Sequence, residues 1–68
     1  MDISARLAAN MKRLRKERGW SQEHLAHEAG LHRTYISQLE RCKKVPTIVS
    51  LEQIVRALDV GFDEMLGE

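Results

Sequence analysis

Residues 22–41, which read QEHLAHEAGLHRTYISQLER, decide the fold of this 68-residue chain. Gly30 separates two helical patterns and permits the positive φ that a sharp turn between helices requires. Ala26 is a small residue on the inward side of the first pattern, so the second helix can cross close over it. Apolar residues fill the turn and dock the second helix: Leu31, Ile36 and Leu39. Two helices joined by a short, glycine-containing turn form a helix-turn-helix unit, whose second helix projects from the surface.

Three further helical patterns flank this unit. A first helix of about four turns precedes it and ends near Gly19, after a basic last turn. Pro46 and Thr47 mark the start of a fourth helix, and Val60 and Gly61 introduce a short fifth one. The apolar residues expected in these helices are Ile3, Leu7, Met11, Leu14, Leu51, Ile54, Val55, Leu58, Phe62, Met65 and Leu66. No segment alternates apolar and polar residues long enough for a strand, so the predicted fold is all-α. We expect one domain over residues 1–68, a compact bundle of five short helices.

The composition excludes several classes of protein. Hydrophobic residues make up 43% of the chain and charged residues 31%, which is typical of a folded domain and not of a disordered one. Cys42 is the single cysteine, so no intrachain disulfide forms and a cytosolic location is expected. No apolar run approaches the ~20 residues of a membrane span, and the start of the chain lacks a signal-peptide pattern.

The charges are distributed unevenly along the chain. Residues 1–44 hold ten Lys and Arg and five Asp and Glu, giving +5, whereas residues 45–68 hold one Arg and five acidic residues, giving −4. The two halves sum to the net charge of +1. A basic half that contains a helix-turn-helix unit indicates binding of a polyanion, with the projecting helix entering a DNA major groove.

The chain resembles the Cro and phage-repressor helix-turn-helix family, whose members are also described as xenobiotic-response-element-like regulators. The family includes the controller proteins of restriction–modification systems. The resemblance covers residues 6 to 66 and is carried by GWSQE (19–23), LA (25–26), AGL (29–31), YIS (35–37), LER (39–41), PT (46–47), Leu51 and AL (57–58). It implies a transcription regulator that binds double-stranded DNA sequence-specifically, as a homodimer on a near-palindromic operator. Such a protein would act in the cytoplasm at the nucleoid.

The resemblance also implies roles for individual residues. Arg33 would pair with guanine, Gln38 with adenine, and the methyl group of Thr34 would touch a thymine methyl, with Ser37 as a further base-reading candidate. A second group would contact the DNA backbone: Ser21, Gln22, Tyr35, Lys43, Lys44 and Thr47. For Ser21, the local pattern also predicts the N-cap of the 22–29 helix. Arg15 and Glu40 occupy positions where the family often has a buried ion pair between the first and third helices.

The chain departs from the family pattern at three positions. Cys42 replaces a usual glycine after the third helix, and a left-handed conformation there would cost about 1 kcal/mol. A reactive thiol is the alternative role for Cys42. Asp59 replaces a second glycine after the fourth helix, where Asp is tolerated. His32 replaces a capping Ser or Thr, and its imidazole is either a plain surface group or a phosphate contact.

The apolar final segment has two interpretations. Its side chains would either form the contact between two copies of the chain or close the core of one copy, and a small core completed by a partner would combine both. The residues concerned are Val60, Phe62, Met65 and Leu66.

Other functions have weaker support in the sequence. Small members of this family serve as antitoxins, but the chain has no extra tail to wrap a toxin. No nucleophile elbow, phosphate-binding glycine loop or paired carboxylates indicate an enzyme. His24 and His27, with Glu23 and Glu28 nearby, suggest a metal site, yet a structural zinc site needs four ligands and the cysteine is distant in sequence. We therefore expect no metal, no cofactor and no small-molecule effector.

Overall fold

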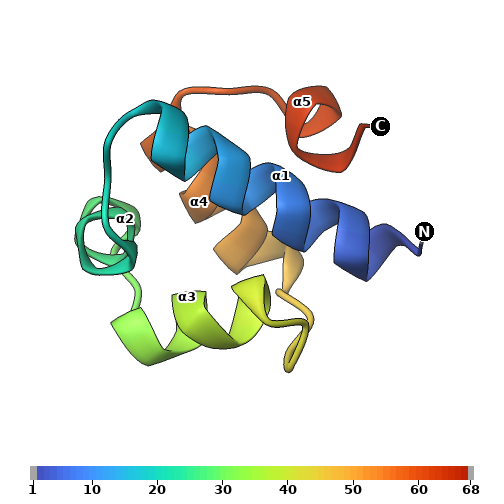
Figure 1. Cartoon of the computed structure of the whole chain (residues 1–68), viewed down its shortest axis with the longest axis horizontal. Coiled ribbons are helices and arrows are strands. Elements are labelled where there is room, and N and C mark those ends of the chain that lie inside the picture. Colours follow the sequence, from blue (N-terminus) through green and yellow to red (C-terminus); the bar gives the residue numbers. More distant parts are fainter. Residues whose placement is uncertain (1, 68) are drawn as a thin grey trace.

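A computed structural model describes residues 2–67 and contains five helices within that range. They are α1 (Ile3–Glu17), α2 (Gln22–Ala29), α3 (Arg33–Glu40), α4 (Ile48–Leu58) and α5 (Phe62–Leu66). Residues 2–67 contain no strand, so the all-α prediction is confirmed. In Figure 1, α1 crosses the front of the molecule, α3 runs below it, and α4 lies behind the two. None of the described helices is long and apolar enough to cross a membrane.

Side-chain caps explain where three of the helices begin. Asp2 Oδ1 accepts the N–H of Ala5 at 2.8 Å before α1. Ser21 Oγ accepts the N–H of His24 at 3.0 Å before α2, and Thr47 Oγ1 accepts the N–H of Ser50 at 3.0 Å before α4. Each bond satisfies an N–H group that has no partner inside the helix. The capping role predicted for Ser21 and the helix start predicted at Thr47 are thus confirmed.

Left-handed residues explain where α2, α3 and α4 end. Gly30 ends α2 with φ +71°, a conformation that glycine adopts without a Cβ clash. Cys42 has φ +59° and Asp59 φ +58°, although both carry side chains. After α3, the N–H of Cys42 donates to Leu39 O at 3.1 Å and the N–H of Lys43 donates to Gln38 O at 2.8 Å. This pair of bonds is a Schellman motif, and Cys42 adopts in it the left-handed conformation whose cost was considered above from the sequence.

The core lies where the five helices meet. Its fully buried side chains come from every helix: Met11, Leu25, Ile36, Ile54, Leu58 and Met65. Helix α3 packs against α2 and α1, while α5 packs against α1 and α4. Asn10 Nδ2 on α1 holds the end of α5 by donating to Met65 O at 2.8 Å and to Gly67 O at 2.7 Å.

This packing corrects one part of the expected contact between copies. Met65 has no exposed surface, because α5 turns it into the core between α1 and α4. Val60 and Leu66 are half-buried against the same core, and of the four candidates only Phe62 is largely exposed, at 44%. Met65 therefore closes the core of one copy and is not available to a partner.

Candidate nucleic-acid interface

The helix-turn-helix unit is formed by α2, the turn at residues 30–32 and α3. Ala26 is buried beneath α3, and Ile36 and Leu39 turn inward from α3 to the core. Leu31 packs against this core from the turn, and its N–H donates to Ala26 O at 2.9 Å. Because the apolar side of α3 is fixed in this way, its opposite side faces solvent.

The outward side of α3 carries most of the predicted base-reading residues. Arg33 and Thr34 are exposed, while Ser37 and Gln38 are half-buried. A shallow groove on this side is lined by Arg33, Thr34, Ser37 and Arg41. A second groove brings Arg33 next to the start of α2 and is lined by Arg15, Ser21, Gln22, Glu23 and Arg33. Arg33 therefore lies where the predicted base-reading and backbone-binding surfaces meet.

Arg41 is a basic residue of this surface that the sequence did not single out. It is exposed directly after α3, and its Nε donates to Ser37 O at 3.4 Å. The signal was present in the spacing, because residues 33, 37 and 41 are four apart and share one side of a helix. Arg41 thus extends the row that starts at Arg33.

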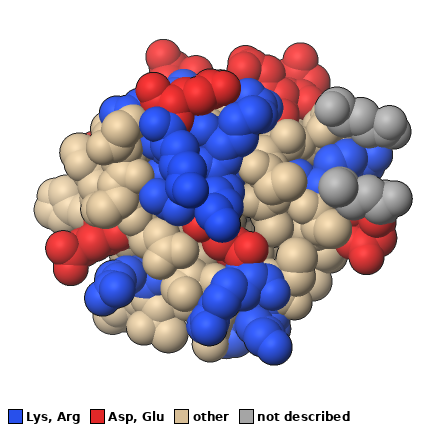
Figure 2. All heavy atoms as spheres, viewed as in Figure 1, with Lys and Arg blue, Asp and Glu red and all other residues tan. Residues whose placement is uncertain are grey.

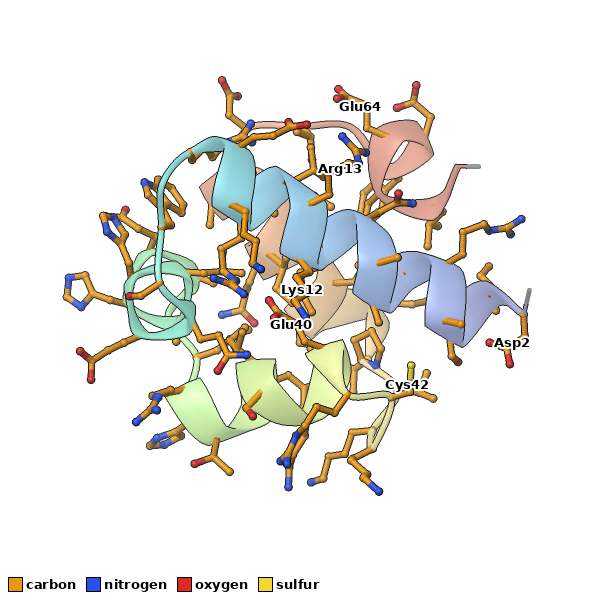
Figure 3. The ribbon with its side chains drawn as sticks, viewed as in Figure 1. Asp2, Lys12, Arg13, Glu40, Cys42 and Glu64 are labelled. Carbon is orange, nitrogen blue, oxygen red and sulfur yellow. The ribbon has the colours of Figure 1, made fainter. Side chains whose placement is uncertain are left out.

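A buried ion pair joins α1 to the end of α3. The guanidinium of Arg15 donates from Nε to Glu40 Oε2 at 2.8 Å and from Nη2 to Glu40 Oε1 at 2.9 Å. The two side chains are only 9% and 2% exposed. The bond from Nη1 of Arg15 to Trp20 O, at 2.8 Å, ties the segment before α2 to the same group. Figure 3 shows Glu40 rising from α3 toward α1.

This pairing changes the acid–base behaviour of Arg15. Its hydrogen bond to Glu40 raises the pKa of Arg15, with the negative charge of that carboxylate adding to the effect, while burial acts in the opposite direction. The guanidinium is therefore charged at every pH at which the protein would work. The carboxylate of Glu40 lies directly against this charge, so the pair links α1 to α3 and adds no net charge beside the start of α2.

Two residues predicted to contact the DNA backbone have partners within the protein. Gln22 Nε2 donates to Glu40 Oε1 at 3.1 Å, which orients the amide at the first position of α2. The hydroxyl of Tyr35 lies 2.8 Å from Ser50 Oγ and links α3 to α4. These bonds have structural roles that the sequence did not reveal, because each joins residues 15 or more positions apart. Contact of either residue with DNA stays a prediction.

Basic side chains gather on the face that includes α3. Figure 2 shows Lys and Arg over the middle of α1 and again below it, around α3 and the loop that follows. Lys12 is an exposed residue of α1, and it is labelled in Figure 3. Lys43 and Lys44 are exposed in the loop after α3. The asymmetry seen along the sequence thus becomes a basic face on the folded chain.

The two histidines considered for a metal site have other neighbours. The ring of His24 stacks on Trp20, with centroids 4.4 Å apart and planes 9° from parallel. Its Nε2 lies 3.6 Å from Glu28 Oε1. Among residues 2–67, no three His, Cys, Asp or Glu side chains come together to hold a metal ion.

Comparison with known proteins places this arrangement among helix-turn-helix proteins. The helix-turn-helix family model HTH_3 matches residues 11–65. A Neisseria meningitidis protein described as a hypothetical transcription factor is 42% identical over 65 residues, which are 96% of this chain and 61% of that protein. This chain thus spans about three-fifths of that relative.

Solved structures share the fold closely. The wild-type restriction–modification controller protein C.Esp1396I superposes with a TM-score of 0.88 at 40% identity, covering 97% of this chain and 90% of that one. SinR, a master regulator for biofilm formation solved in complex with DNA, gives a TM-score of 0.84 at 35% identity. That match covers 90% of this chain and 98% of the SinR chain.

Proposed function

Since this chain belongs to the HTH_3 helix-turn-helix family, we propose that it is a transcription regulator that binds duplex DNA sequence-specifically, as a homodimer on a near-palindromic operator. The observation that carries the proposal is the outward side of α3, where Arg33, Thr34 and Arg41 line one groove. Arg33 also lines a second groove at the start of α2. One relative of similar length is described as an uncharacterized helix-turn-helix-type transcriptional regulator, and the SinR chain reported above was solved with DNA. Such a protein would act at the nucleoid, in the cytoplasm.

In this proposal, α3 reads the bases from the major groove. Arg33 would donate two hydrogen bonds to a guanine, and Gln38 would bond to the edge of an adenine. Thr34 and Ser37, which lie between these two residues in the sequence, would also contact bases. Arg33 stands at the first position of α3 and is exposed.

The backbone contacts would surround this helix on two sides. On one side, Ser21 and Gln22 lie at the start of α2, where free N–H groups favour a phosphate. On the other side, Lys43, Lys44 and Thr47 follow α3, and all three are exposed. These contacts would fix the register of α3 on the duplex.

Two copies are expected because one eight-residue helix touches few base pairs. On a symmetric operator, the two recognition helices would enter successive major grooves about 34 Å apart. The antitoxin alternative is not favoured, since the relatives reported above are described as transcription regulators or controllers.

The experiment that tests the proposal is selection of duplexes from a random pool at about 0.15 M salt. The wild-type protein should enrich a near-palindromic motif, and an Arg33→Ala/Gln38→Ala variant should not. Arg56→Ala is a matched control, because Arg56 is an exposed arginine on α4, outside the helix-turn-helix unit. Enrichment of no motif by the wild type would refute sequence-specific binding, and equal enrichment by the double variant would remove α3 from the base-reading role.

A further inference from the structure

Three exposed apolar side chains lie together at the start of α4. Val45 is 72% exposed, Ile48 84% and Val49 68%, and we call these three residues the α4 patch. The described part of the chain exposes only two other large apolar side chains, Ile3 at 55% and Phe62 at 44%. Large exposed apolar side chains are thus concentrated within five consecutive positions, and such a concentration is typical of a contact site.

Nothing within a single copy explains apolar residues at these positions. Ile48 and Val49 are the first two residues of α4, where the free N–H groups favour acidic or polar side chains. Both are β-branched, which lowers helix propensity. The helix gains its start from the Thr47 cap and its core contacts from Ile54, Val55 and Leu58. Residues that break local preference without a gain inside the monomer indicate a partner.

The position of the α4 patch connects it to the recognition helix. It follows the end of α3 by a short loop, and in Figure 1 this loop leads from α3 back to α4 at the end of α3 away from α2. Lys43 and Lys44, the proposed phosphate contacts, lie in that same loop. A copy seated on the α4 patch would therefore lie beside the same DNA, beyond the C-terminal end of α3.

The charges around the α4 patch suit a second copy of the chain. Lys44 lies directly before the patch, and Glu52 is four residues after Ile48, on the same side of α4. In a two-fold contact, residue i of one copy meets residue j of the other and the reverse. Lys44 of each copy is thus available to pair with Glu52 of the other, twice per dimer.

We propose that the α4 patch is the surface through which two copies of this chain associate on DNA. This inference rests on the proposed function and replaces α5 as the main contact between the copies. It has a consequence for the operator, because α3 runs from Arg33 toward the loop that leads to the patch. Base pairs read by Gln38 must then lie nearer the centre of the palindrome than those read by Arg33.

The test compares two neutral variants with a duplex that carries one or two half-sites. Ile48→Gln/Val49→Gln removes the apolar patch without changing charge, and Phe62→Gln is the matched control on α5. Wild type and control should bind the two-site duplex in one cooperative step. The patch variant should lose about 100-fold in affinity for that duplex, the order of gain expected from linked binding, yet change less than about twofold on one half-site.

Sedimentation of the free protein separates this inference from the proposed function. Wild type should self-associate with increasing concentration, and the patch variant should stay monomeric with an unchanged urea midpoint. Cooperative binding that survives in the patch variant, or that is lost in the Phe62 variant, would overturn the inference. A wild type that stays monomeric and occupies two half-sites independently would also overturn it and leave DNA binding intact. Failure to prefer any duplex would refute the proposed function, while sedimentation would still decide the contact.

Discussion

Removing the carboxylate of Glu40 should destabilise the protein severely. In Glu40→Ala, the guanidinium of Arg15, which is 9% exposed, loses both hydrogen bonds to the carboxylate, and Gln22 loses its bond to the same group. Loss of one partner of a buried ion pair costs about 3–5 kcal/mol, because the remaining charge stays in a poorly solvated place. At about 0.05–0.15 kcal/mol per residue, a 68-residue chain has a total stability of about 3–10 kcal/mol. The substitution should therefore remove much of the free energy of unfolding.

A second ion pair, between two residues of α1, provides the control. Arg13 Nη1 lies 3.1 Å from Glu17 Oε2, but these side chains are 52% and 54% exposed. An exposed pair four residues apart on a helix contributes only about 0.3–0.5 kcal/mol. Glu17→Ala should therefore shift the urea midpoint slightly, whereas Glu40→Ala should shift it strongly. Urea unfolding at about 15 °C, near the usual maximum of stability, keeps the weaker variant measurable.

The double variant Arg15→Met/Glu40→Leu tests the reasoning further. Replacing both charges by apolar groups removes the unpaired guanidinium, so much of the stability lost in Glu40→Ala should return. Because the folded-state pKa of Arg15 is raised, its contribution is complete below the pKa of the unfolded state and is lost only when the pH rises through the folded value. The difference between wild type and Glu40→Ala should thus not decline between neutral and moderately alkaline pH. A cost for Glu40→Ala as small as that for Glu17→Ala would refute the buried-pair argument.

Four further substitutions separate structural from DNA-binding roles. Cys42→Gly should raise the free energy of unfolding by about 0.5–1 kcal/mol, because glycine adopts φ +59° without strain; an unchanged or lower urea midpoint would contradict this. Tyr35→Phe should lose about 1 kcal/mol of stability with its bond to Ser50, and a large loss of DNA affinity without loss of stability would instead make Tyr35 a DNA contact. Lys44→Ala should weaken binding to all duplexes and reduce the slope of log affinity against log salt by about one, and an unaltered slope would exclude a phosphate contact. Arg33→Ala should cost about 1–3 kcal/mol on the specific site and little on random DNA, and unchanged discrimination would exclude base reading.

The helices were predictable from the sequence because their ends depend on local chemistry. Ser21, Gly30 and Thr47 act on backbone groups within a few residues, so their positions in the chain are enough to locate a helix end. The family pattern has glycine at the position of Cys42, and this glycine indicates that a left-handed turn is possible there. The fold class follows once five such segments carry apolar sides.

The partners of polar side chains were not predictable in the same way. The bond between Tyr35 and Ser50, and that between Gln22 and Glu40, depend on how α3 packs against its neighbours. The orientation of α5 has the same dependence, which is why the sequence leaves Met65 as a candidate for either the core or the contact between copies, although it is buried. Apolar spacing shows that a residue is inward on its helix, but not whether the core or a partner covers it.

The contacts of α3 suggest what determines the spacing of the operator. Arg15 holds its C-terminal end to α1 through Glu40, and Ser50 holds its first turn to α4 through Tyr35. Helix α3 also packs against α2. Specific reading of bases requires such positioning to within about 0.5 Å. If two copies meet at the α4 patch, the path from one recognition helix to the other runs through α3, residues 41–47 and the patch. Changes in the length of that loop should then alter the preferred half-site spacing while leaving the half-site sequence unchanged.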